Sequence, residues 1–149
     1  MKEFSPEVVE ALEAAGWHRG RQVDVEGWRA GLAGEGLRMP DAAAEFLASF
    51  GGLKFDLKGR GITRGKEPFD LDPLVAAGEE GRFVDWGREI GRALFPIGEL
   101  DGGHFFLAID EEGEIYCLAD RLGSFGRGVE GLEGLILGVM PEWRDAADC

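Results

Sequence analysis

Two short runs of alternating apolar residues around an acidic turn constrain the fold of this 149-residue chain more than any other feature. The runs cover residues 104 to 110 and 114 to 119, and the turn between them reads Asp110-Glu111-Glu112-Gly113. Alternation with period two is typical of a strand with one buried face, and Gly113 suits the left-handed position of a type I turn with a bulge. The segment therefore predicts a β-hairpin and, with it, a sheet built on hairpin connections.

Five segments elsewhere carry apolar residues at the spacing of a helix. The first begins with a capping serine, a proline at the first helical position and an acid in the first turn, and it closes at Gly16. The clearest covers residues 40 to 50, whose apolar side chains share one face before Gly51 and Gly52 end the helix. We predict helices over about 6–15, 25–33, 40–50 and 80–92, and a last helix from Leu132 to before Pro141.

The remaining segments read as strands and loops. Residues 53 to 57 alternate as a strand, and residues 93 to 98 read as a strand that ends at, or bulges near, Pro96. Residues 59 to 81 predict a loop with one irregular strand, and the glycine-rich residues 123 to 128 predict a flexible loop before the last helix. This order predicts a single α+β domain over residues 1–149, with helices packed on an antiparallel or mixed β-sheet, a core over about 4–140 and a tail over 141–149.

The charge of the chain is uneven. The formal net charge is -13, and residues 1 to 66 carry 10 basic and 10 acidic side chains, whereas residues 67 to 149 carry 6 and 19. The whole excess therefore falls in the second part. A field of this sign repels nucleic acid and anionic lipid and steers basic partners toward the molecule, so we expect no nucleic-acid binding.

Several other classes are excluded as well. No apolar run approaches the roughly 20 residues that cross a bilayer, and the N-terminus has no secretion signal, so we expect a cytoplasmic protein that does not bind a membrane. Cys117 lies in a predicted strand and Cys149 ends the chain, which favours two free thiols over a disulfide.

Catalytic and metal-binding motifs are not found. The two histidines and two cysteines are far apart in sequence, which argues against a metal, and we expect no cofactor. Neither Cys117 nor Ser124 lies in a nucleophile motif, and His104 reads as a strand-edge residue, so we expect no enzyme activity. Residues 123 to 128 lack the Lys-Ser/Thr ending of a phosphate-binding loop, and a structural loop is the favoured interpretation.

Acidic side chains at the hairpin tip are the main candidates for contact with a partner. Paired carboxylates can serve acid–base chemistry or calcium, but the spacing fits no EF-hand, and a solvated turn is the simpler alternative. A rigid tip with acids is also well placed to contact a basic partner. Trp28 and Trp86 lie on predicted core faces, whereas Trp17 and Trp143 lie near element ends. The candidate partner-binding residues are Asp110, Glu111, Glu112, Glu114, Glu79, Glu80 and Trp17.

Several segments, in order, resemble the SUKH superfamily and within it the third subfamily of bacterial immunity proteins. The resemblance runs from about residue 4 to 140 and rests on the segments Ala15–Arg21 with Trp28, Ala44–Leu53, Phe95–Glu99, Ala108–Tyr116 and Leu132–Gly138. It implies an α+β fold and a protein that binds a cognate toxin made by the same bacterium. It carries no catalytic motif. Residues 59 to 81 and the glycine-rich segment before the last helix depart from the family pattern and are candidate regions for partner specificity.

These observations together favour a non-enzymatic immunity protein whose acidic surface occupies the basic substrate cleft of a nuclease or other nucleic-acid-directed toxin. The alternative, which superfamily members outside toxin systems imply, is a general adaptor or regulatory module that is unrelated to toxins. A small hydrolase that depends on His104 or Ser124 is a third hypothesis, and we expect no such activity.

Overall fold

The computed structural model describes residues 4–34 and 36–144. Helices and strands follow one another in this part of the chain as α1 (Pro6–Ala14), α2 (Glu26–Ala33), α3 (Asp41–Phe50), β1 (Lys54–Phe55), β2 (Phe69–Asp70), the 3-10 helix η1 (Pro73–Ala76), α4 (Glu80–Ile90), β3 (Phe95–Leu100), β4 (Phe105–Ile109), β5 (Glu114–Leu118), β6 (Leu122–Arg127), α5 (Gly128–Leu137) and β7 (Glu142–Arg144).

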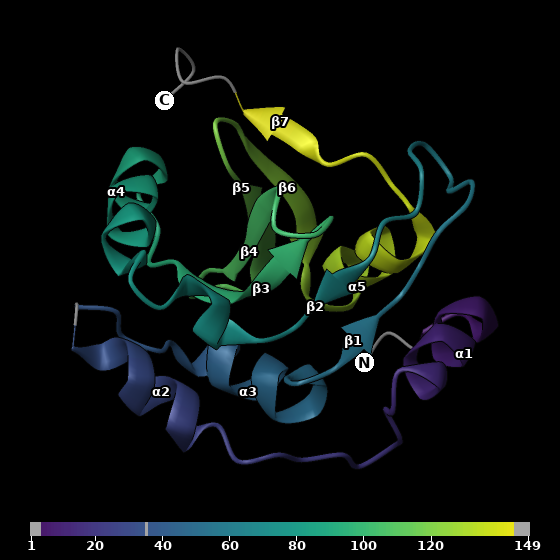
Figure 1. The fold of residues 1–149 in the computed structure, drawn as a ribbon, viewed down its shortest axis with the longest axis horizontal. Coiled ribbons are helices and arrows are strands. Elements are labelled where there is room, and N and C mark those ends of the chain that lie inside the picture. Colours follow the sequence, from purple (N-terminus) through teal and green to yellow (C-terminus); the bar gives the residue numbers. More distant parts are fainter. Residues whose placement is uncertain (1–3, 35, 145–149) are drawn as a thin grey trace.

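The strands form one antiparallel sheet in which each strand pairs with its neighbours in sequence, from β1 at one edge to β7 at the other. Helices lie on both sides of this sheet, with α4 on one side and α5 on the other in Figure 1. The α+β class predicted from the sequence is therefore confirmed, and the sheet is antiparallel rather than mixed. No β-α-β crossover is needed, because every strand connection in the described residues joins adjacent antiparallel strands.

Successive side chains on the central strands point to opposite faces of the sheet, and a different helix covers each face. Phe106 on β4 packs against Phe83 and Trp86 of α4, with ring centroids 5.2 and 6.3 Å apart. Ile115 on β5 points to the other face, where the backbone of Gly131 in α5 lies directly on it. Both faces of β4 and β5 are buried for this reason, and their alternation is less strict than in a one-sided sheet.

Local predictions from capping and turn residues are confirmed. The Ser5 side chain accepts a hydrogen bond from the backbone N–H of Val8 at 3.4 Å and starts α1. The predicted hairpin is present as strands β4 and β5, and Gly113 adopts a left-handed φ of 88° in its turn. The bulge predicted near Pro96 is present, since the pairing of β3 with β4 shifts between Pro96 and Gly98.

The segment after residue 120 differs most from prediction. The loop predicted over 123 to 128 is wrong, because Leu122–Arg127 forms strand β6 and α5 begins immediately after it, at Gly128. The segment that we assigned to a terminal tail supplies the edge strand β7. These two strands stabilise each other: Trp143 of β7 lies opposite Gly123 of β6, and a β-carbon on Gly123 would come within 2.9 Å of that indole.

Cys117 on β5 is a free, buried thiol, whereas Cys149 lies outside the described residues. Burial raises the pKa of Cys117 from about 9 to about 12, because the thiolate would lose its hydration. The unfolded chain releases this proton near pH 9 and the native chain keeps it. Stability should therefore fall as the pH rises from about 9 to 12, by up to about 1.4 kcal/mol per pH unit.

We expect this alkaline loss to be visible in the slope of the unfolding free energy against pH, measured by urea titration from pH 8 to 11. The Cys117→Ala variant should be less stable at neutral pH but should lose stability less steeply above pH 9. The pKa of buried Tyr116 is also raised, but its contribution to the pH dependence of stability is the same in both proteins and cancels when their slopes are compared. Equal slopes for the two proteins would show that the thiol is not the source.

Candidate interaction surface

Asp110, the first residue of the hairpin turn, is completely buried. Its carboxylate accepts hydrogen bonds from the backbone N–H groups of Glu112 and Glu114, at 2.8 and 3.0 Å, and from the Tyr116 hydroxyl at 2.9 Å. The turn leaves these backbone donors without main-chain partners, and the aspartate satisfies them. The expectation that Asp110 is exposed at the tip is therefore wrong: this residue holds the turn together from inside.

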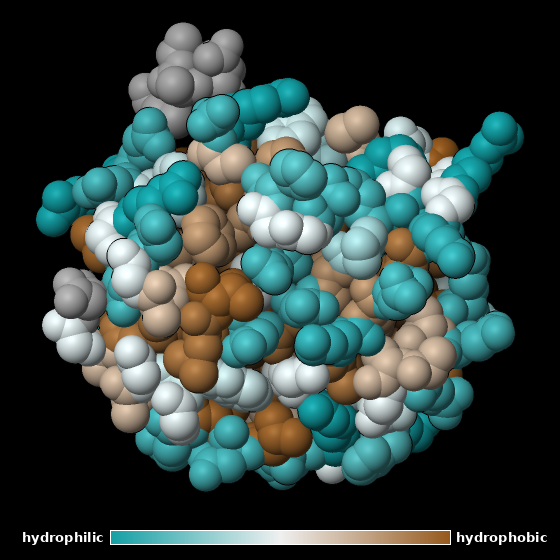
Figure 2. Space-filling model, viewed as in Figure 1, coloured by the Kyte–Doolittle hydropathy of each residue, from teal (hydrophilic) through white to brown (hydrophobic). Residues whose placement is uncertain are grey.

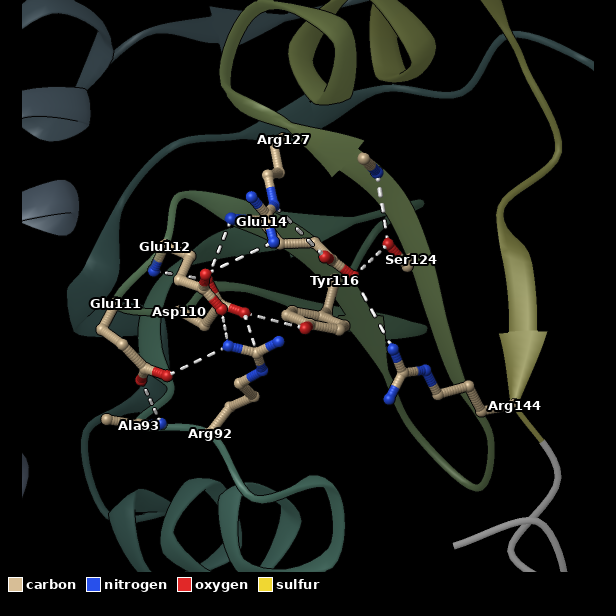
Figure 3. A network of polar contacts seen from close by, with 11 residues as sticks. Arg92, Ala93, Asp110, Glu111, Glu112, Glu114, Tyr116, Ser124, Arg127 and Arg144 are labelled. Atoms are coloured by element: carbon tan, nitrogen blue, oxygen red, sulfur yellow. Dashed lines mark hydrogen bonds and ion pairs between the residues drawn. The ribbon is translucent and has the colours of Figure 1, made fainter.

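Arg92, which follows the C-terminal end of α4, connects the turn to the helix. Its guanidinium lies 3.9 Å from Asp110, 3.6 Å from Glu111 and in direct contact with Glu112 (Figure 3). The Glu111 carboxylate also accepts a hydrogen bond from the backbone N–H of Ala93. Glu111 and Glu112 keep about two fifths of their side-chain surface exposed, so they lie at the edge of the network.

Glu114 lies on the face of the sheet, between two more arginines. Arg127 from the end of β6 and Arg144 from β7 each approach its carboxylate to 3.9 Å, and the Ser124 hydroxyl donates to it at 2.8 Å (Figure 3). Only 17 % of the Glu114 side chain is exposed. The Ser124 hydroxyl is therefore hydrogen-bonded to a carboxylate, and the labelled residues of this network include no histidine.

The structure thus brings four of the predicted acids together and surrounds them with three arginines that the sequence analysis did not select. Four carboxylates and three guanidinium groups leave the cluster with a formal charge of -1. Arg127 lies directly opposite Glu114 in the β5–β6 ladder. This pairing of opposite charges was detectable in the sequence, had residues 122 to 127 been recognised as a strand.

Glu79 and Glu80 are not part of this cluster, because they start α4 and the cluster lies beyond its other end. Glu79 is exposed and lies 3.7 Å from Arg82. Glu80 is only 6 % exposed, and its buried Oε1 atom has no hydrogen-bond partner. The expectation that Glu80 faces a partner at the surface is wrong, since the first turn of α4 directs this side chain inward.

Replacing Glu80 by methionine is expected to raise the free energy of unfolding by about 1 kcal/mol. A buried polar atom without a partner costs about 1–3 kcal/mol, and the methionine removes this cost. The variant also loses the favourable interaction of a carboxylate with the helix N-terminus, which is worth about 0.3–1 kcal/mol. The exposed neighbour provides the control, because Glu79→Met should change stability by less than about 0.5 kcal/mol. Urea unfolding of the two variants and the parent tests this, and a less stable Glu80→Met would contradict it.

Trp17 belongs to an aromatic cluster remote in sequence from the hairpin. Its indole stacks on Phe50 of α3, with centroids 6.3 Å apart, and meets Phe4 edge-on at 6.1 Å. These contacts fasten the segment after α1 to α3. Trp17 and Trp143, which lie near element ends, are partly buried, and Trp28 and Trp86, which were predicted on core faces, are also partly buried rather than fully enclosed.

The fold and the polar cluster together describe an α+β protein whose clustered acids and arginines are held by salt bridges and hydrogen bonds. In residues 4–34 and 36–144, no three His, Cys, Asp or Glu side chains are grouped so as to hold a metal ion. No helix in those residues is long and apolar enough to cross a bilayer.

The chain belongs to the SUKH-3 immunity protein family, whose model matches residues 4–138. The family resemblance drawn from the sequence is thereby confirmed. Searches of curated proteins and of solved structures found no match.

Proposed function

We propose that this protein is a non-enzymatic immunity protein that binds a cognate toxin and neutralises it. Membership of the SUKH-3 immunity protein family carries this proposal. The polar cluster supports it, because its acids and arginines are engaged with one another and with backbone groups, as in a rigid binding scaffold. We place the toxin among nucleases and other nucleic-acid-directed toxins, and the protein in the cytoplasm, where such a toxin finds its substrate.

The net charge of -13 supports an acidic contact surface, but the hairpin tip is not its best location, because arginines neutralise most of the tip. Exposed acids without an ion pair in the described chain are better candidates. Glu89 and Asp120 border one small depression together with Arg121 and Arg144, and Glu142 lies two residues before Arg144 on β7. We call Glu89, Asp120 and Glu142 the acidic rim.

Figure 2 shows the face of the molecule on which α4 and β7 are visible in Figure 1, and a polar face of this kind suits a contact governed by charge. Hydrophilic residues cover much of it, and hydrophobic ones gather in small groups between them (Figure 2). A toxin that binds nucleic acid carries a basic cleft, and carboxylates that occupy the cleft replace the phosphates of its substrate. Such complementarity accelerates association and makes it sensitive to salt.

The test is co-expression with the toxin encoded next to this gene, followed by growth and by affinity measurements on the purified pair. The triple variant Glu89→Lys, Asp120→Lys, Glu142→Lys should lose growth rescue and bind about 100-fold more weakly at low salt. A matched triple variant on the N-terminal helices, Glu10→Lys, Glu13→Lys, Glu45→Lys, changes three exposed acids by the same charge and should still rescue growth.

The outcomes separate the parts of the proposal. Equal loss in both triple variants would assign the effect to net charge rather than to the acidic rim. Full rescue by both would show that the toxin binds through another surface. No binding of the neighbouring gene product by the parent protein would favour an adaptor role instead.

A further inference from the structure

Residues 59–66, between β1 and β2, form a narrow projection that we call the knob. Its two arms are joined by an isolated antiparallel bridge between Arg60 and Gly65, and the Lys66 N–H donates to the Gly59 carbonyl at 2.8 Å. In Figure 1 this segment rises away from the sheet beside α5. Strands β1 and β2 have only two residues each, so the sheet itself has little need of so long a connection.

Arg64 fixes the knob against the C-terminal end of α5. Its side chain is only 8 % exposed, and its guanidinium donates to the Val139 and Leu135 carbonyls at 2.9 and 3.4 Å. The backbones of Gly61 and Gly138 lie so close that a β-carbon on Gly138 would come within 2.7 Å of the Gly61 α-carbon. These contacts satisfy carbonyls that the helix end leaves free, and they hold the knob in one conformation.

The knob presents one large apolar side chain to water, and the segment after α5 presents another. Ile62 is 65 % exposed and Met140 is 48 % exposed, and the only other exposed large apolar side chain in residues 4–34 and 36–144 is Leu74. Ile62 and Met140 are neighbours, because the Ile62 N–H donates to Leu137 at the end of α5 and the Met140 N–H donates to the Thr63 hydroxyl. Two of the three exposed large apolar side chains in the described residues therefore come from adjacent backbone segments, and we call these two side chains the patch.

The charge around this patch is opposite to that of the whole molecule. Lys58 and Arg60 are exposed, and neither forms an ion pair within the described part of the chain. The chain as a whole has a net charge of -13. A partner surface that complements the knob must therefore be apolar at its centre and acidic around it, unlike the basic cleft that the acidic rim would fit.

We propose that the knob is a second contact with the toxin, in which Ile62 enters an apolar pocket bordered by carboxylates. This inference rests on the proposed function for the identity of the partner. An apolar side chain held in place before binding loses little conformational freedom when it is buried, so a single residue at the centre of such a contact carries much of the affinity. Arg60 and Lys58 face the carboxylates and select the partner.

The experiment compares affinities of the full-length protein for the toxin of the neighbouring gene, by calorimetry at low and high salt. Ile62→Asp should weaken binding about 30-fold or more, and Arg60→Glu about tenfold, with the smaller effect disappearing at high salt. Leu74→Asp places the same new charge at another exposed apolar site and should change the affinity less than twofold. Ile62→Ser provides a milder variant if the aspartate lowers the unfolding midpoint.

The outcomes distinguish this inference from the proposed function. If the parent protein binds the toxin and the affinity is unchanged in Ile62→Asp, Ile62→Ser and Arg60→Glu, the knob contact alone is overturned. No toxin binding by the parent would overturn both proposals. The free protein could instead self-associate, and Ile62→Asp could abolish this self-association while leaving the toxin affinity unchanged. That result would assign the knob to a second copy of this chain and overturn the toxin contact.

Discussion

Replacing Asp110 by alanine should lower the free energy of unfolding by about 3–5 kcal/mol, the largest loss that we expect from one side chain of the hairpin. The carboxylate is fully buried and accepts three hydrogen bonds, so its removal leaves two turn N–H groups and the Tyr116 hydroxyl without a partner. It also removes the buried charge near Arg92. Because domains of this size are stable by only about 5–15 kcal/mol, this loss is a large fraction of the total and should clearly lower the urea midpoint of the variant.

Urea unfolding followed by tryptophan fluorescence measures this loss. Glu111→Ala is the matched control, since it removes the next acid of the same turn, which is 40 % exposed, and should cost less than about 1 kcal/mol. Asp110→Asn keeps the shape of the side chain but offers one acceptor atom fewer and no charge, so it should fall between the two. Similar losses for Asp110→Ala and Glu111→Ala would show that the turn is held by something other than Asp110.

Replacing Gly98 by alanine should cost at least about 3 kcal/mol, because the new methyl group would overlap the carbonyl oxygen of Asp70. Gly98 lies at the bulge where β3 changes register, and Asp70 belongs to β2, which pairs with β3. The obstacle is backbone rather than a flexible side chain. Removing the overlap therefore requires β2 to move away from β3, and this movement breaks the end of the sheet that carries β1.

Gly27→Ala in α2 is the control for this substitution, since a β-carbon there meets no atom within 4 Å. Alanine favours the helix by up to about 1 kcal/mol, so this variant should be as stable as the parent or slightly more stable. Thermal unfolding of both variants by circular dichroism gives the comparison. A Gly98→Ala protein with an unchanged midpoint would mean that β2 and β3 separate without cost.

The parts of the fold that could be predicted from the sequence depend on contacts between near neighbours. The capping serine of α1, the apolar face of α3 and the glycine turn of β4–β5 all act within a few residues, and the structure has each of them. Strand β6 could not be recognised, because Gly123 and Gly126 resemble a loop in the sequence. Glycine is suited to position 123 because an indole twenty residues later packs on it.

The candidate site was predictable only in part for the same physical reason. Proximity of the four turn acids follows from the hairpin. Their neutralisation depends on arginines that come from three other places in the chain and meet only when the sheet is complete. The inward direction of Glu80 is also a tertiary effect, since a glutamate in the first turn of a helix normally faces water.

The fastening of the knob to α5 bears on when this protein can first act. Hairpin pairs such as β4–β5 and β5–β6 close short loops, which assemble quickly. The hydrogen bond from Arg64 to Val139 instead joins residues 75 positions apart, and closure over such a span comes at an entropic cost that only a nearly finished fold offsets. A chain still emerging from the ribosome lacks residues 135–140 and cannot present Ile62 in its fixed position. Recognition through the knob would thus be reserved for molecules whose chain has been synthesised through residue 140 and whose helix α5 has folded onto the sheet.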